Sequence, residues 1–292
     1  MKQFFLFVIA GLMLNGCIKN NPDPAWIEIT PWTLLPNTNA QYPTGELTHA
    51  FTEAWVYVND DLMGVFQVTD TVKFPVLKSG AVNIKVYPAI RNNGVSATKK
   101  IYPFVERYEI NTTLVQNQTL QINPVTRYSS MVKFSIEDFE DPAIKIVNDP
   151  NSMTQMSQGN DPSILQWGNY YGFVNLTQAD STWNAYTNFN SINEANLPRG
   201  KEVYLEIDYY NTNAVVTGLL WISSSSIKNN TNYQLNKQDP SSVKWKKIYI
   251  DLKELISNSP AGSYFEQSFQ AILDAGDTEG TIIIDNIKVV HF

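Results

Sequence analysis

The sequence predicts an all-β protein built from two β-sandwiches, and three observations support this. Aromatic residues make up 12% of the 292 residues and charged residues only 17%, a composition that suits pleated sheets. Short stretches alternate apolar with polar side chains, and turns rich in Asn, Gly and Pro separate them. The chain is also long enough for two domains, each with its own core.

The chain begins with a basic start and an uncharged apolar run over residues 4–14. A run of this length is typical of a signal peptide, because a membrane-spanning helix needs about 20 apolar residues. The run ends in "LNGC", which resembles the lipobox of bacterial lipoproteins, with Gly16 as the small residue before the cysteine. The resemblance implies that residues 1–16 are a cleaved signal peptide. It also implies that Cys17, the one cysteine, is acylated.

Lipidation at Cys17 implies a membrane partner and a location at the outer membrane, on either its periplasmic or its cell-surface side. Residues 17–25, which contain "NNPDP", are expected to form a short tether.

Residues 26–124 follow the rhythm of short strands and tight turns. Residues 53–68 predict a hairpin that turns at Asn59-Asp60, and residues 107–124 predict a second hairpin that turns at Gln116-Asn117. Between them, Val82, Ile84 and Val86 alternate with polar or amphipathic residues, as in a half-buried strand. About seven short strands in 100 residues predict an Ig-like β-sandwich. In strand rhythm, this unit resembles the Ig-like domains of Bacteroidetes-type surface lipoproteins.

Residues 130–292 form a second predicted unit of longer strands, which suggests a jelly-roll sandwich. The stretch "SYFEQSFQAILDA" is the exception. Its Phe265, Phe269 and Leu273 follow i, i+4, i+8 spacing, which indicates a helix.

Three short motifs give this second unit a family resemblance. They are "FSIEDFED" (134–141), "WKKIYIDL" (245–252) and "GTIIIDNIKVV" (280–290), and they resemble strands of galactose-binding-like jelly rolls, a fold of many carbohydrate-binding modules. The resemblance implies that the first and last strands are neighbours. It also implies a structural calcium held by Glu137 or Glu140 together with Asp285, because calcium prefers oxygen ligands. The alternative is that the acids are solvated and that Asp285 forms a turn.

Catalytic groups are scarce. The two histidines, His49 and His291, lie in different predicted domains, and the one cysteine is assigned to the anchor. A Ser-His-Asp triad or a His-rich zinc site is therefore hard to build, and we expect no enzymatic activity. The formal net charge is −7 and the sequence has no cluster of Lys and Arg, so we do not expect the protein to bind nucleic acid.

Aromatic residues in polar loops are the candidates for sugar binding, because flat rings stack on pyranose faces while amides and acids bind hydroxyl groups. The best stretches are "WGNYYG" and "STWNAYTNF", which contain Trp167, Tyr170, Tyr171, Trp183 and Tyr186. The alternative is that these rings are core residues, as aromatics in sandwiches commonly are. Two functions follow: a glycan-binding module, or a structural subunit that docks on another envelope complex. If Trp167, Trp183 and Tyr186 share an exposed concave face, the first is favoured.

Overall fold

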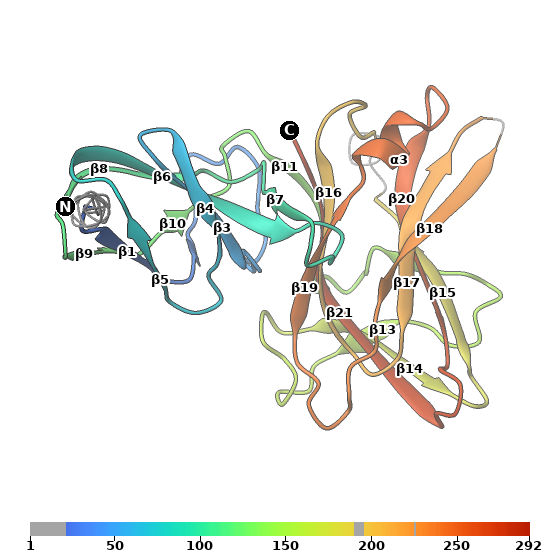
Figure 1. The fold of residues 1–292 in the computed structure, drawn as a ribbon. Helices are drawn as coiled ribbons and strands as arrows, with labels where there is room; N and C mark the ends of the chain where they lie inside the picture. The colour runs from blue at the N-terminus through green and yellow to red at the C-terminus, as the bar shows by residue number, and fades with distance from the viewer. Residues whose placement is uncertain (1–21, 190–195, 225) are drawn as a thin grey trace, which may run out of the picture.

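The computed structural model describes residues 22–189, 196–224 and 226–292 and consists of two β-sheet units side by side (Figure 1). The predicted signal peptide and Cys17 lie outside the described residues. The predicted all-β class is confirmed: the described part contains the short helix α3 (Lys253–Ser257) among its many strands. Among these residues, no helix has the length and hydropathy needed to cross a membrane.

The first unit packs one larger sheet against two smaller ones. The larger sheet has the order β4-β3-β6-β7, with β8 also paired to β6, and the smaller sheets are β5-β1-β9 and β10-β2. The strands are β1 (Ala25–Ile29), β2 (Thr33–Leu34), β3 (Glu53–Val58), β4 (Asp61–Gln67), β5 (Val72–Val76), β6 (Gly80–Arg91), β7 (Lys99–Ile101), β8 (Tyr108–Leu114), β9 (Thr119–Ile122) and β10 (Val125–Thr126).

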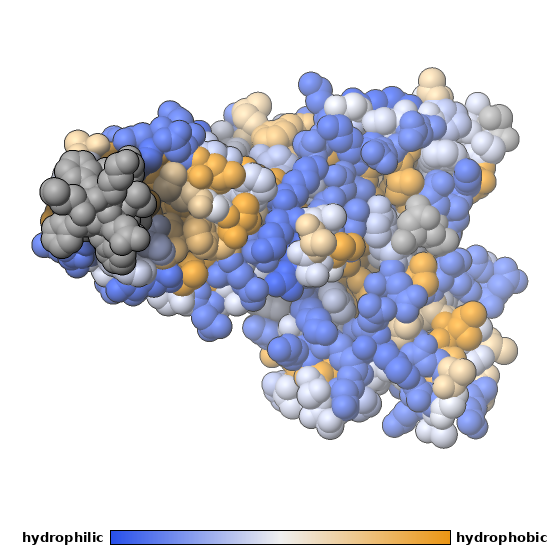
Figure 2. Space-filling view, in the orientation of Figure 1, coloured by the Kyte–Doolittle hydropathy of each residue, from blue (hydrophilic) through white to orange (hydrophobic). Residues whose placement is uncertain are grey.

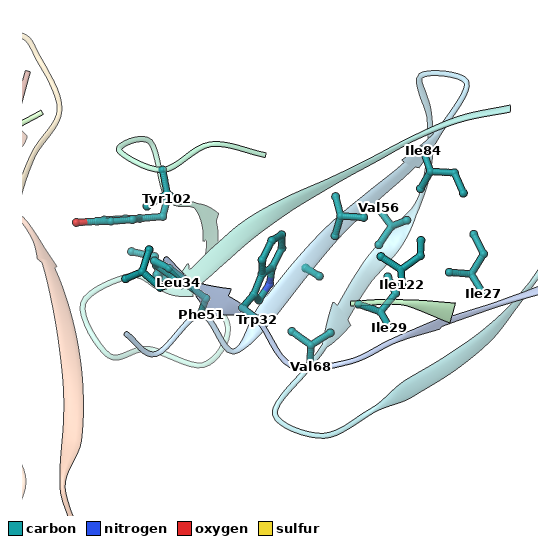
Figure 3. Packing of buried hydrophobic residues seen from close by; sticks show 14 of the residues in the cluster. Ile27, Ile29, Trp32, Leu34, Phe51, Val56, Val68, Ile84, Tyr102 and Ile122 are labelled. Carbon is teal, nitrogen blue, oxygen red and sulfur yellow. The ribbon is translucent and has the colours of Figure 1, made fainter. Parts of the chain in front are cut away.

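Inward-facing aliphatic side chains form the core of this unit (Figure 3). On β6, Val82, Ile84 and Val86 are buried, as their alternation predicted. The hairpin β3–β4 turns at Asn59 and Asp60, whose φ angles of 52° and 64° fit a type I′ turn. The second predicted hairpin is wrong: β8 pairs with β6 and β9 pairs with β1, so the two strands belong to different sheets.

The second unit is a sandwich of two sheets. The inner sheet, which faces the first unit, has the order β13-β14-β21-β16-β19, with β11 also paired to β21; the outer sheet has the order β12-β15-β20-β17-β18. The strands are β11 (Lys133–Glu137), β12 (Ile146–Asn148), β13 (Ser157–Gly159), β14 (Tyr171–Thr177), β15 (Thr182–Thr187), β16 (Val203–Asn211), β17 (Val215–Ile222), β18 (Ile227–Leu235), β19 (Lys246–Asp251), β20 (Tyr264–Ile272) and β21 (Glu279–His291). As predicted, the first and last strands of this unit are neighbours.

The predicted helix over residues 263–275 is wrong, because this segment forms strand β20. Phe265, Gln267, Phe269 and Ala271 alternate into the core along the strand. Phe265 and Phe269 are four residues apart, so their spacing satisfies both a helix and a strand. Pairing with β15 on one side and β17 on the other decides in favour of the strand.

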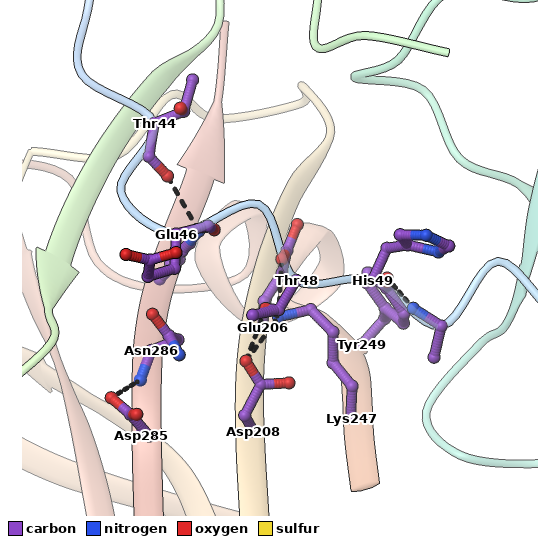
Figure 4. A network of polar contacts seen from close by, with 12 residues as sticks. Thr44, Glu46, Thr48, His49, Glu206, Asp208, Lys247, Tyr249, Asp285 and Asn286 are labelled. Carbon is purple, nitrogen blue, oxygen red and sulfur yellow. Dashed lines mark hydrogen bonds and ion pairs between the residues drawn. The ribbon is translucent and has the colours of Figure 1, made fainter. Parts of the chain in front are cut away.

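The two units share a buried junction. Tyr102, Phe104 and Tyr128 of the first unit pack in one cluster with Tyr204 and Tyr249 of the second. The loop between β2 and β3 crosses β21, β16 and β19 of the inner sheet (Figure 4). We therefore expect separated units to expose this aromatic surface to water, whatever their ability to fold alone.

Charged groups are buried at the same junction. The carboxylate of Glu206 accepts hydrogen bonds from the hydroxyls of Tyr102 at 2.5 Å and Tyr128 at 2.9 Å. The Lys247 ammonium lies 3.1 Å from Glu206 and 3.4 Å from Asp208. The hydroxyl of Thr48, from the crossing loop, donates to Asp208 at 2.5 Å (Figure 4). Hydrogen bonds from hydroxyl groups of the first unit to buried carboxylates of the second unit therefore hold the two units in a fixed register.

Candidate functional site

The candidate binding site is a groove on the outer face of the outer sheet, with a volume of about 440 Å³. We call it the outer groove and define it by Asn184, Tyr186, Asn229, Tyr264, Glu266 and Gln270, which all line it. These residues come from β15, β18 and β20, so a rigid sheet fixes their relative positions. The volume lies within the range typical of small-ligand sites.

Strand alternation places these side chains outside. On β20, Phe265 and Phe269 point into the core, so Tyr264, Glu266 and Gln270 point to the opposite face. Tyr264 is 44% exposed.

Small residues make the sheet surface hollow. Tyr186 is paired with Ser268, and Ser268 is paired in turn with Gly218 on the next strand. The Ser268 hydroxyl donates to the Asn229 side-chain oxygen at 2.8 Å. The small side chains of Ser268 and Ala185 line the outer groove, together with the larger side chains of Tyr186 and Tyr264.

Several polar ends in the outer groove are free to bind a ligand. Within the part of the chain that the structure describes, the side chains of Tyr186, Glu266 and Gln270 make no hydrogen bond to other residues. Burial raises the pKa of Glu266 above its ordinary value, which reflects its partly dry position. On the face shown in Figure 2, hydrophobic residues gather in a patch on the first unit and in smaller spots on the second.

The structure places Trp183 in the core, contrary to its prediction as a sugar-binding residue. Its side chain is 0% exposed, stacks on Phe269 at 5.9 Å between centroids, and donates through Nε1 to Asn148 at 3.1 Å. Tyr171 is also buried, and its hydroxyl accepts a hydrogen bond from the backbone of Asp161 at 3.2 Å. Trp183 faces the sandwich interior together with Ala185. Tyr171 alternates with the core residues Val174 and Leu176, so it points to the opposite face of β14, where its ring lies over Gly159.

The remaining predicted aromatics do not meet on one face. Tyr186 lines the outer groove, whereas Trp167 lines a different cleft beside the first unit. Tyr170 is 38% exposed and lines neither of them. Tyr264 and Glu266 were missed by the sequence analysis because their segment was assigned to a helix. The alternation of "YFEQSFQAI" was the signal that could have found them.

The predicted calcium ligands are partly brought together. Asp138, Glu140, Asp285 and Asn286 line a cavity of about 100 Å³, and Glu46 of the first unit also borders it. Glu137 does not line this cavity. Its carboxylate accepts hydrogen bonds from the backbone amides of Phe139, at 2.6 Å, and Lys145, so Glu137 closes the end of β11 instead.

The oxygen atoms that line this cavity suit a cation such as calcium in one respect but form an incomplete ligand set in another. Asn286 is 1% exposed, and neither its amide oxygen nor its amide nitrogen has a hydrogen-bond partner among the described residues. A cation would satisfy that oxygen. However, no three Asp, Glu, His or Cys side chains converge into a metal site within the described ranges. The Asn286 amide would therefore have to complete the ligand set.

Burial and mutual repulsion disfavour the ionised form of Asp285 in this cavity. Burial raises the pKa of Asp285 to about 8, and the nearby carboxylates Asp208, Asp138 and Glu140 add to the rise. Burial also acts to raise the pKa of Glu140, but hydrogen bonds from Asn169 and the backbone of Tyr170 lower it overall. Asp285 is thus a buried acid that holds a proton near neutral pH unless a cation lies beside it.

Comparisons with known proteins give distant structural similarities. No known family model matches the chain, and no curated protein sequence matches it. A CBM22 xylan-binding domain from Paenibacillus barcinonensis is 14% identical with a TM-score of 0.37, covering 54% of this chain and 99% of that one.

Two further solved structures are similar at the same level. A family 11 carbohydrate-binding module from Clostridium thermocellum, in complex with a mixed-linked tetrasaccharide, is 15% identical with a TM-score of 0.36, covering 54% of this chain and 94% of that one. A structure of carbohydrate-binding modules from the β-sandwich superfamily is 12% identical with a TM-score of 0.37, covering 81% and 84%. None of these similarities assigns a ligand or a residue role to this chain.

Proposed function

We propose that this protein is a lipid-anchored carbohydrate-binding protein of the outer membrane, without catalytic activity, and that the outer groove holds the glycan. One observation carries the proposal: two tyrosine rings, Tyr186 and Tyr264, line a sheet-borne groove together with unsatisfied polar side chains. Phenol rings supply apolar faces for pyranose stacking. The first unit, which we propose to be Ig-like, acts as a spacer.

The chemistry of the outer groove favours a neutral sugar chain. Asn184, Gln270 and Asn229 offer amide groups that donate and accept hydrogen bonds, which suits sugar hydroxyls. Glu266 adds a strong acceptor. Lysine and arginine do not line this groove among the described residues, so we do not expect it to select anionic sugars.

A glycan array probed with protein lacking residues 1–17 tests the proposal, followed by calorimetric titration of the best neutral ligand. We expect Tyr186→Ala and Tyr264→Ala each to weaken binding at least tenfold, which corresponds to about 1.4 kcal/mol. Tyr170→Ala is the matched control, because Tyr170 is similarly exposed but lies outside the groove. An array without a neutral hit, or a hit insensitive to both groove substitutions, would favour the docking subunit instead.

We also propose that the cavity around Asp285 holds a structural calcium ion. The proposal rests on the orphaned amide of Asn286 and on the carboxylates of Asp285, Glu140 and Asp138 around it. Asp285 and Asn286, on β21, would be the inner ligands, with Glu140 and Asp138 supplying negative charge near β11. The ion would stabilise the fold by neutralising carboxylates that otherwise repel one another.

Melting temperature with calcium and with chelator, combined with elemental analysis, tests this proposal. We expect calcium to raise the melting temperature of the parent but not of Asp285→Asn, while the exposed control Asp161→Asn keeps the response. In chelator, folded Asp285 keeps its proton up to about pH 8 whereas the unfolded chain loses it near pH 4, so the parent loses stability as pH rises from about 4 to 8. Asp285→Asn should then gain stability relative to the parent over the same window. Equal parent melting temperatures with and without calcium would reject the ion.

A further inference from the structure

A second cleft lies between the two units, on the opposite side of the sandwich from the outer groove. It has a volume of about 550 Å³, and both units line it. His49 and Arg91 come from the first unit, while Trp167, Lys244, Trp245 and Lys246 come from the second. We call it the junction cleft. The buried network of Thr48, Asp208 and Lys247 forms part of its wall.

Indole rings give the junction cleft a rigid aromatic wall. Trp167 and Trp245 meet edge to face, with centroids 5.3 Å apart, and Tyr210 packs on Trp245 at 5.9 Å. The indole nitrogen of Trp245 donates to the carbonyl of Ile164 at 2.8 Å, which fixes the ring orientation. Both indoles remain partly exposed. A fixed, partly exposed indole is a suitable surface for the apolar face of a sugar ring.

The charge of the junction cleft differs from that of the whole protein. The chain has a formal net charge of −7, yet Lys244 and Lys246 line this cleft, are exposed, and form no ion pair within the described residues. Arg91 adds a third cation, held 3.4 Å from Glu53. The carboxylate that lines the cleft, Asp208, is already bound by Thr48 and Lys247. The free charges are therefore positive and available for an anionic ligand.

We propose that the junction cleft is a second saccharide site and that it takes acidic sugars, those carrying carboxylate or sulfate groups. The indoles of Trp167 and Trp245 supply the stacking surface, and Lys244 and Lys246 pair with the anionic substituents. Because both units line the cleft, a bound acidic saccharide contacts both and stabilises their relative placement. This site is independent of the outer groove, whose lining favours neutral sugars.

The test uses the full chain without residues 1–17 and three probes: a galacturonic acid trimer, a sulfated galactose trimer and a neutral galactose trimer. Binding is measured by calorimetry at low and at high salt. We expect at least one acidic trimer to bind more tightly than the neutral trimer, with affinity falling as salt screens the charges. The two acidic probes distinguish carboxylate from sulfate recognition.

Substitutions then locate the site. We expect the double variant Lys244→Gln/Lys246→Gln to weaken acidic binding at least tenfold while keeping the parent melting temperature. Trp245→Phe tests stacking without opening a large cavity and should also weaken binding. Lys73→Gln is the matched control, because Lys73 is an exposed lysine over a tryptophan ring, Trp26 at 5.4 Å, in the first unit and outside the cleft.

Two results would overturn the proposal. One is the absence of tighter binding for either acidic trimer. The other is acidic binding that survives the double lysine substitution or disappears with Tyr186→Ala, which would place the ligand in the outer groove. Acidic binding that is lost in the double lysine variant but kept in Tyr186→Ala supports the junction cleft even if no neutral glycan is ever found for the outer groove.

Discussion

Lys247→Met tests the buried charged network of the second unit on which the first unit packs. The Lys247 side chain is 3% exposed, and its ammonium lies between Glu206 and Asp208, which are themselves buried. Methionine keeps most of the aliphatic stem but removes the charge. Two buried carboxylates then lose the cation that balances them, while their own contacts to Tyr102, Tyr128 and Thr48 remain.

The expected loss is about 3–5 kcal/mol in the free energy of unfolding, the usual cost of removing one partner from a buried ion pair. That is a large share of the roughly 5–15 kcal/mol that stabilises a folded domain. Burial acts to raise the pKa of Glu206, and Lys247 is the largest influence lowering it, so the variant's carboxylates should hold protons more readily. The loss should therefore shrink as pH falls from 7 towards 5.

Urea unfolding followed by tryptophan fluorescence measures the effect. The double variant Lys247→Met/Glu206→Gln should recover at least half of the loss, because the amide oxygen of glutamine still accepts from the tyrosines and one uncompensated charge is gone. Lys85→Met is the control: Lys85 pairs with Asp60 at 2.6 Å on the surface and should change stability little. A Lys247→Met loss below about 1 kcal/mol, well under the buried-pair range, or one that is independent of pH, would refute the reasoning.

Three further outcomes are expected. Trp183→Ala should cost about 3–5 kcal/mol in unfolding free energy, because its ring is fully buried against Phe269; a loss under 1 kcal/mol in urea unfolding would show that the ring is not core. Gly168→Ala should destabilise the protein by about 1–3 kcal/mol, because its φ is +57° and the added carbon would lie 2.2 Å from a Glu140 oxygen; an unchanged melting temperature would contradict this. Cys17→Ala should move the protein from the membrane fraction to the soluble fraction; retention as complete as the parent's would reject the lipid anchor.

Local chemistry explains what could be read from the sequence. The turn at Asn59-Asp60 was predictable because Asn and Asp tolerate positive φ, and both adopt it. The pairing of β11 with β21 brought Glu140 and Asp285 to one cavity, as the resemblance implied.

Trp183 and Tyr186 were predicted to share one binding surface, but their spacing in the sequence already argues against this. Trp183 and Tyr186 are three residues apart on one strand, so they must point to opposite faces of the sheet. Both could not line one binding surface. The sequence could not say which faced out; packing of Trp183 on Phe269 of β20 decides it.

The junction was beyond the sequence analysis because its partners are far apart in the chain. Glu206 is 104 residues from Tyr102, and Thr48 is 160 residues from Asp208. In sequence, Glu206 and Asp208 look like ordinary acids of an alternating strand. Only the packing of the first unit on the inner sheet makes them buried. The orphaned amide of Asn286 is likewise a product of tertiary structure.

The placement of the two clefts bears on how an anchored protein could meet its ligands. Strand β1, which follows the proposed tether, lies at the end of the first unit farthest from the second, and the outer sheet lies on the far side of the second unit (Figure 1). Residues 17–25 can span at most about 30 Å when extended. If Cys17 carries the anchor, as proposed, the outer groove lies a full unit and both layers of a sandwich away from the anchored end, a position accessible to the proposed glycan. The junction cleft lies between the units, nearer the proposed anchor than the outer groove is.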